Sequence, residues 1–243
     1  MARIERDYYK ILLVSSSGQG KTYSFRNLVA AKTGFINAEN KPLPFSNQYV
    51  PASSGGTLAR PTKWAGVVKA FDDFSKNPAI DIIVLDSISA AFDMLLEEAR
   101  TNFNGWDVWN YYNKMVGEFV SKIKKAEKEV VITGHYELLN IEGAPEKRLK
   151  MKGKEWEGVF EKEFTIVLYP EIKYKGGKPD SYWFKLASEG SSAKCPPSIF
   201  GDGVFEVPND FKVVYDKVLA FAMGSSTTTN VPSEAEIDQT IFN

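Results

Sequence analysis

The sequence predicts an α/β fold, in which a mainly parallel β-sheet is flanked by helices and extended by a C-terminal antiparallel β-hairpin. Three observations lead to this prediction. Apolar runs of strand length alternate with amphipathic runs of helix length up to residue 135, and buried parallel strands have this continuously apolar character. From about residue 163, two β-rich runs flank the turn KGGKPD, which is typical of a hairpin. The apolar content of 43% in 243 residues suffices for one core.

Each predicted element follows from its local pattern. Uninterrupted apolar or β-rich runs predict strands at 8–14, 34–39, 80–86 and 129–135. Apolar residues at helical spacing predict helices at 22–33 and 63–76, and a long helical stretch after residue 86 that is interrupted around 101–107. The hairpin is expected to comprise 163–174 and 181–188, and a last helix to span 210–223.

Composition limits the classes of function. We predict one domain over residues 1–223 and a disordered tail at 224–243, which has three acidic residues and no Lys or Arg. The net charge of −1 provides no global positive field for nucleic acid. The single cysteine, Cys195, excludes an internal disulfide framework and fits a reducing compartment. Because no signal peptide or span of about 20 apolar residues is present, we expect a cytoplasmic protein without membrane contact.

The stretch SSSGQGKT nearly matches the phosphate-binding loop G-x-x-x-x-G-K-[ST], with Ser15 replacing the first glycine. Such loops wrap backbone N–H groups around phosphate oxygens, a lysine reaches the terminal phosphates, and a hydroxyl binds Mg²⁺. The alternative is a chance Gly/Ser turn. The strand before the stretch and the Lys-Thr pair within it favour a nucleotide site, whose predicted residues are Ser16, Ser17, Gly18, Gln19, Gly20, Lys21, Thr22 and Tyr23.

Other polar residues follow predicted strands. Asp86 ends the run IIVLD, and we expect it to hold Mg²⁺ together with Thr22. The alternative is that Asp86 is a helix N-cap. Glu39 ends the second strand, where a carboxylate can polarise a water molecule, or it is a simple loop acid. His135 ends the fourth strand near the expected terminal phosphate, although a lone histidine there is more often structural.

A basic run follows the fourth strand. Its members, which we predict to contact DNA, are Lys147, Arg148, Lys150, Lys152 and Lys154. The aromatic residues Trp156 and Phe160 lie close by and are candidates for stacking on bases. The alternative is a solvated loop, which is the usual fate of a charge run.

In a second aromatic cluster, Trp109 and Tyr112 have helical spacing and are expected in the core. Phe103 and Trp106 are equally compatible with a first DNA loop and with an ordinary helical connection.

In their order along the chain and in their local sequence, these segments resemble the RecA-like recombinase ATPases. Among these, they most resemble the phage ATP-binding single-strand annealing proteins. The resemblance covers residues 8 to about 205. It implies that FINAEN holds the catalytic Glu39, that IIVLDSISA holds the metal-binding Asp86, and that VVITGHY holds His135 as a phosphate sensor before a DNA loop at 137–155.

The same resemblance makes Lys194, in SSAKCPPSIF, a finger that reaches the neighbouring subunit's nucleotide. Alternatively, Lys194 is an exposed loop lysine. The chain departs from RecA at Ser15, at the histidine sensor, and in the few residues that precede the first predicted strand. RecA-type filaments use an N-terminal extension to join subunits, so both a ring and a filament stay open.

The resemblance implies an ATPase that uses ATP and Mg²⁺, binds single-stranded DNA as a homo-oligomer, and promotes annealing or strand exchange in phage recombination or replication. The tail end EAEIDQTIFN is similar to the partner-recruiting tips of single-stranded DNA-binding proteins, or it is a plain disordered terminus. Three alternatives stay open: a RecA-type helicase motor, a DNA annealing module in which ATP binding stabilises only the oligomer, and a P-loop small-molecule kinase.

Overall fold

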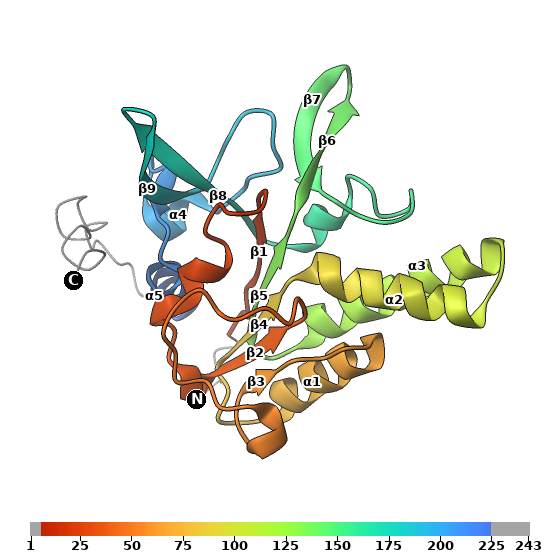
Figure 1. The fold of residues 1–243 in the computed structure, drawn as a ribbon. Coiled ribbons are helices and arrows are strands. Elements are labelled where there is room, and N and C mark those ends of the chain that lie inside the picture. The colour runs from red at the N-terminus through yellow and green to blue at the C-terminus, as the bar shows by residue number, and fades with distance from the viewer. Residues whose placement is uncertain (1–5, 225–243) are drawn as a thin grey trace.

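A computed structural model describes residues 6–224, which are built around one large β-sheet (Figure 1). Its eight strands have the order β10-β9-β8-β1-β5-β4-β2-β3. The strands of this sheet are β1 (Lys10–Val14), β2 (Thr33–Asn37), β3 (Leu58–Ala59), β4 (Ile82–Asp86), β5 (Glu129–Gly134), β8 (Ile166–Lys175), β9 (Lys178–Lys185) and β10 (Glu206–Pro208). The pairs from β3 across to β8 are parallel, whereas β9 pairs antiparallel with both β8 and β10.

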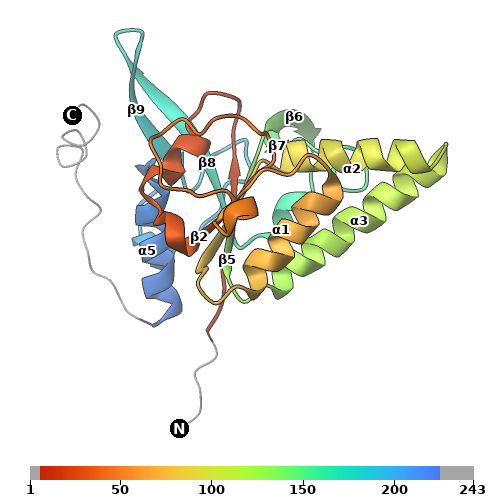
Figure 2. The same cartoon turned by 60° about the horizontal axis from the view of Figure 1, so that its bottom comes forward.

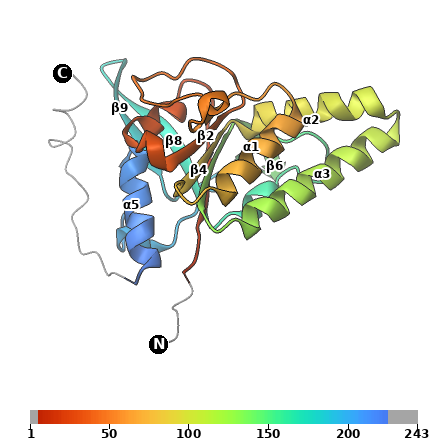
Figure 3. The same ribbon diagram turned by 90° about the horizontal axis from the view of Figure 1, so that it is seen from below.

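Helices cover both faces of this sheet, as Figures 2 and 3 show. The α-helices are α1 (Trp64–Lys76), α2 (Ile88–Asn102), α3 (Trp106–Lys125), α4 (Pro197–Phe200) and α5 (Phe211–Ala222). Helices α1 to α3 lie on one face and share one apolar cluster with Leu12 and Val14 of β1. Ile11 and Leu13, on the opposite face of β1, belong to a second cluster that includes residues of α4 and α5. The alternation along β1 therefore supplies two apolar cores.

The predicted α/β fold class is confirmed: a mainly parallel sheet with helices on both faces is extended by the antiparallel hairpin β8–β9. The expected interruption of the long helical stretch is also present, because α2 ends at Asn102 and α3 begins at Trp106. Together these two helices form a long projection, seen at the right of Figure 1.

The segment 137–155 was expected to be a loop, and this expectation is wrong. Most of it belongs to a separate two-stranded hairpin, β6 (Tyr136–Ile141) and β7 (Ala144–Leu149). The turn consists of Glu142 and Gly143, both with positive φ (51° and 88°), as favoured two-residue hairpin turns require. Figure 1 shows β6–β7 and β8–β9 extending from the same end of the large sheet.

The predicted helix at 22–33 is also wrong in form. The structure has two 3₁₀ helices there, Thr22–Asn27 and Ala30–Lys32, separated by extended backbone at Leu28. Ser24 Oγ donates to the carbonyl of Lys21 at 2.6 Å and so competes for an acceptor that an α-helix would use. Arg26 reaches across to the carbonyl of Asn209 at 2.8 Å, which ties this short segment to the C-terminal part of the chain.

The predicted tail at 224–243 lies outside the described residues except for Gly224. Over residues 6–224, the helices are too short or too polar for any of them to cross a membrane. Two further 3₁₀ helices occur, at Ala52–Ser54 and Phe160–Glu163.

Candidate nucleotide site

The predicted phosphate loop follows β1 directly. Gly18 and Gly20 have φ values of 80° and 85°, which glycine adopts without steric cost. Ser15 is 2% exposed, and its backbone N–H donates to the carbonyl of Gly134 in β5 at 3.2 Å. Because its φ is not positive, this position does not require glycine. The serine that departs from the motif is therefore compatible with the loop.

Lys21 is held inside the loop and is only 7% exposed. Its Nζ donates to the carbonyls of Ser15 and Ser16 at 2.9 and 2.8 Å. Burial lowers its pKa from 10.5 to about 8, although the nearby carboxylates Asp86 and Glu39 act in the opposite direction. The site thus holds a poorly solvated ammonium that gains from an anionic partner.

Asp86 stands at the end of β4 as expected, 4% exposed and beside the phosphate loop. Thr22 Oγ1 donates to its Oδ2 at 2.7 Å, and Thr133 donates to its Oδ1. Burial raises the pKa of this carboxyl, and the two hydroxyl donors act against that rise. The N-cap of α2 is Ser87, whose hydroxyl accepts from Ala90 N–H, so Asp86 is not the cap.

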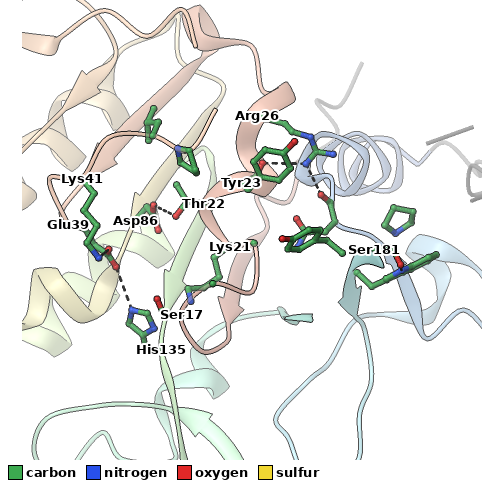
Figure 4. Close-up of a pocket in the computed structure, with 18 of the residues that line it drawn as sticks. Ser17, Lys21, Thr22, Tyr23, Arg26, Glu39, Lys41, Asp86, His135 and Ser181 are labelled. Carbon is green, nitrogen blue, oxygen red and sulfur yellow. Dashed lines mark hydrogen bonds and ion pairs between the residues drawn. The ribbon is translucent and has the colours of Figure 1, made fainter. Parts of the chain in front are cut away.

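Glu39 and His135, predicted separately from two strand ends, meet in the structure (Figure 4). His135 Nε2 lies 3.5 Å from Glu39 Oε1, which also accepts from Ser87 Oγ at 3.1 Å. Lys41 Nζ lies 2.7 Å from the other carboxylate oxygen. The hydrogen bond from His135, with that from Lys41, lowers the pKa of Glu39 to about 2, against the effect of burial. Glu39 is therefore an oriented, ionised carboxylate rather than a strong base.

These groups share one cavity of about 770 Å³, within the size range of small-molecule sites. Figure 4 shows Glu39, Asp86 and His135 toward one end, Lys21 between, and Tyr23, Arg26 and Ser181 toward the other. The full lining is Ser17, Gly18, Gly20, Lys21, Thr22, Tyr23, Arg26, Asn37, Glu39, Lys41, Pro42, Leu43, Pro44, Asp86, His135, Lys175, Asp180, Ser181, Tyr182, Trp183, Pro208 and Asn209.

The residues present fit a magnesium–nucleoside triphosphate. A Cβ atom at Gly18 would meet nothing within 4 Å, so the loop surface is open beside the buried Lys21 ammonium. Thr22 and Asp86 form a hydroxyl–carboxylate pair, and Mg²⁺ in nucleotide sites takes one or two such protein groups together with phosphate oxygens and water. The ion would neutralise charge on the phosphates.

Comparison with known proteins decides the family. The profile of the AAA domain family matches residues 7–193, which include the phosphate loop, Glu39, Asp86 and His135. The chain belongs to this family. It is therefore an AAA-type P-loop ATPase domain, for which ATP and Mg²⁺ are the implied nucleotide and metal.

No match was found among curated proteins. Among solved structures, a KaiC-like protein from the hyperthermophilic archaeon Pyrococcus horikoshii OT3 is similar, with a TM-score of 0.43 and 12% sequence identity. The alignment covers 73% of this chain and 78% of that chain.

Two predicted loop residues do not line the cavity of the AAA domain. Ser16 contributes its carbonyl to Lys21. Gln19 Oε1 accepts from the backbone N–H of Ile172 at 3.0 Å. Gln19 therefore ties the phosphate loop to the β8–β9 hairpin through its side chain.

The predicted DNA-contacting cations divide into two groups. Three of them have carboxylate partners: Lys147 with Glu171 at 3.0 Å, Arg148 with Glu146 at 2.6 Å, and Lys152 with Asp93 at 3.5 Å. Lys150 and Lys154 are exposed, and neither side chain has an ion-pair or hydrogen-bond partner within residues 6–224. The cations that remain available for a polyanion are thus fewer than the sequence suggested.

Phe160 is fully buried and packs edge-on against Phe92, so the expectation that it stacks on bases is wrong. Trp156 packs against it, with ring centroids 6.0 Å apart. Tyr112 is fully buried, and Trp109 packs against that core, as expected.

At the tip of the α2–α3 projection, Trp106 is 83% exposed. Phe103 beside it stacks on Tyr111, with centroids 4.8 Å apart.

Lys194 does not line the cavity of its own chain within the described residues. Its backbone pairs with Val167 of β8 in both directions, at 2.8 and 2.9 Å. Partial burial lowers the pKa of its ammonium, while Glu161 and Glu163 act in the opposite direction. Its predicted role toward a neighbouring subunit stays a prediction.

Sequence reasoning missed the wall of the cavity opposite Glu39. Tyr182 comes from β9, and Asn209 follows β10. No local motif marks these residues, because they reach the phosphate loop only through the folding of distant segments. Lys41 had a signal, since it lies two residues after the predicted Glu39.

Proposed function

We propose that this AAA-type ATPase binds single-stranded DNA in an ATP-dependent manner and promotes annealing or strand exchange in phage recombination or replication. It acts as a homo-oligomer, in a ring or a filament. The proposal combines the nucleotide cavity, the basic segment of residues 147–154, which begins in β7, and the resemblance noted from the sequence.

One observation carries the proposal: His135 joins the cavity to the basic segment. Its side chain lies 3.5 Å from the Glu39 carboxylate. Its own carbonyl accepts from the backbone N–H of Lys150 at 2.7 Å, and its N–H donates to Ser89 Oγ at 3.2 Å. A change in nucleotide state that moves Glu39 would therefore act through His135 on the backbone of Lys150. Lys150 is one of the two predicted DNA-contacting cations that are exposed and have no side-chain partner within residues 6–224.

The decisive experiment measures ATP hydrolysis with and without single-stranded DNA, with Lys21→Ala as the blank. We expect DNA to stimulate the wild type. The Lys150→Glu/Lys154→Glu variant should bind DNA on the order of tenfold more weakly and lose most of the stimulation, with a reduced salt slope. The matched control is Lys76→Glu/Lys125→Glu, which reverses two exposed lysines at the C-terminal ends of α1 and α3.

Each other outcome points to an alternative. Turnover that ignores DNA but requires a metabolite would favour a small-molecule kinase, and ATP-driven strand separation would favour a helicase motor. ATP binding without turnover, with annealing intact in Glu39→Gln, would favour a module that ATP merely stabilises. If the control variant lost DNA stimulation as fully as Lys150→Glu/Lys154→Glu, the basic segment would not be the DNA site.

The oligomeric part of the proposal is tested by mixing subunits. A Lys21→Ala subunit keeps Lys194 but has a defective phosphate loop, whereas a Lys194→Ala subunit has the reverse defect. If Lys194 acts on the neighbouring subunit, each variant alone should be inactive and their mixture should recover part of the ATPase activity. A mixture with no more activity than its components would reject a role in trans.

A further inference from the structure

Asn209 is a buried amide without a partner. Its side chain belongs to a residue that is 3% exposed, and neither Nδ2 nor Oδ1 has a hydrogen-bond partner among the described residues. Buried polar groups are nearly always satisfied, because leaving one unpaired forfeits its interaction with water. An amide with both functions unpaired therefore requires an explanation.

The amide lies in the nucleotide cavity, next to the phosphate loop. Asn209 is one of the cavity-lining residues. A Cβ atom added at Gly20 would come within 3.3 Å of Asn209 Nδ2 and 2.9 Å of the Tyr182 ring. The absence of a side chain at Gly20 thus brings the loop backbone close to both groups. The Asn209 amide therefore lies beside the backbone of the phosphate loop, within the same cavity.

The backbone of Asn209, a residue that lines the cavity, is fixed from two sides. Its N–H donates to the carbonyl of Tyr182 at 2.9 Å, and its carbonyl accepts from Arg26 Nη1 at 2.8 Å. The Arg26 guanidinium also lies over the ring of Tyr23, 4.6 Å from its centroid. The Tyr23 and Tyr182 rings line the same cavity, with centroids 6.4 Å apart. The rings of Tyr23 and Tyr182 and the amide of Asn209 therefore belong to the lining of one cavity.

We propose that Asn209 selects adenine as the base of the bound nucleotide, with Tyr23 and Tyr182 as apolar walls for the ring. The amide offers a donor and an acceptor side by side. Adenine presents the complementary pair, its 6-amino group and N7, whereas guanine presents two acceptors at that edge. Aromatic rings accept any base face, so the walls supply affinity and the amide supplies the choice. This inference rests on the nucleotide binding that the proposed function requires.

The test is equilibrium binding of magnesium complexes of ATP, GTP and purine riboside triphosphate, the last lacking the 6-amino group. The wild type should prefer ATP over both by at least about tenfold, because a site built around a hydrogen bond rejects analogues that cannot make it. Asn209→Leu should weaken ATP binding and bring the three affinities to within about threefold of one another. Asn102→Leu, at an exposed residue in the last turn of α2, is the matched control and should retain the preference.

Folding and function are separated by two further measurements. Replacing an unpaired buried amide with an apolar group of the same branched shape should leave the melting temperature unchanged or raise it. With the melting temperature measured as unchanged or higher, a lost preference in Asn209→Leu is not an effect of unfolding. If Asn209→Leu kept the wild-type preference for ATP over the other two, the inference would be overturned. In a parallel titration with dATP, an Asn209→Leu variant that lost only its discrimination between ATP and dATP would also overturn the inference, because the amide would then contact the ribose.

The inference and the proposed function fail differently. ATP preference that depends on Asn209, without any effect of DNA on turnover, would reject the DNA-directed function and leave the adenine site standing. A wild-type protein that bound none of the triphosphates, like Lys21→Ala, would overturn both.

Discussion

Replacing Lys21 with methionine tests the electrostatics of the phosphate loop. The ammonium is 7% exposed, and burial lowers its pKa from 10.5 to about 8. Methionine keeps a similar length and removes the charge. We expect the pH dependence of stability to differ between the two proteins in one defined window.

The sign and size follow from this pKa. Between pH 8 and pH 10.5 the unfolded chain keeps the Lys21 proton while the folded protein has released it, so the wild-type free energy of unfolding rises with pH there. At about 1.4 kcal/mol per pH unit, the rise attributable to Lys21 is about 3 kcal/mol. Lys21→Met lacks this contribution. Lys10, whose pKa burial also lowers to about 8, is present in both proteins and cancels from the difference.

The assay is urea unfolding at pH 7 and pH 10.5, followed by the fluorescence of the five tryptophans. The stability of the wild type relative to Lys21→Met should increase by about 3 kcal/mol between the two values. Lys125→Met, at an exposed lysine, serves as the control and should follow the wild type. Stability curves for wild type and Lys21→Met that stay parallel across the window would refute a poorly solvated ammonium in the loop.

Two further predictions concern the carboxylate at the cavity and the apolar core. Glu39→Gln should keep ATP affinity but slow single-turnover hydrolysis by roughly 100-fold or more, because the amide cannot orient a water molecule as the carboxylate does; lost ATP binding would contradict this assignment. Phe160→Ala should lower the free energy of unfolding by about 3–5 kcal/mol, because it empties a fully buried site between Phe92 and Phe164. At temperatures where this variant is folded, its DNA affinity should match that of the wild type. A loss of DNA affinity in the folded variant would indicate that Phe160 stacks on bases after all.

Much of the fold follows from local pattern, because its central strands are continuous apolar runs that end in polar residues. Asp86 and Glu39 were predicted from strand ends together with the phosphate loop and the family resemblance, since the carboxyl ends of parallel strands share one edge of a sheet. The strand order β5-β4-β2 brings them to the same edge as His135, where Glu39 and His135 interact. The sequence did not reveal that residues 136–149 form the hairpin β6–β7, since Pro145 within a run argues against a strand.

Other parts of the site depend on contacts between distant segments. The helical pattern at 22–33 was overridden by hydrogen bonds of Ser24 and Arg26 to backbone carbonyls. Lys147 and Lys152 looked available in the sequence, but Glu171 and Asp93 approach them only in the folded protein. Local propensity carries no information about such partners, so the free cations could not be separated from the paired ones.

The short 3₁₀ segment behind the phosphate loop has a consequence for how the protein is made. Arg26 and Asn27 are tied to Asn209 and Asp210, each pair 183 positions apart in the chain. During translation the phosphate loop is therefore synthesised early, whereas Asn209 and Asp210, which hold the segment behind it, are synthesised only near the end of the described chain. The nascent polypeptide acquires β1, β2 and β4 long before it can close the nucleotide cavity. The contacts that support the phosphate loop from the side can thus form only after residues 209 and 210 have been synthesised.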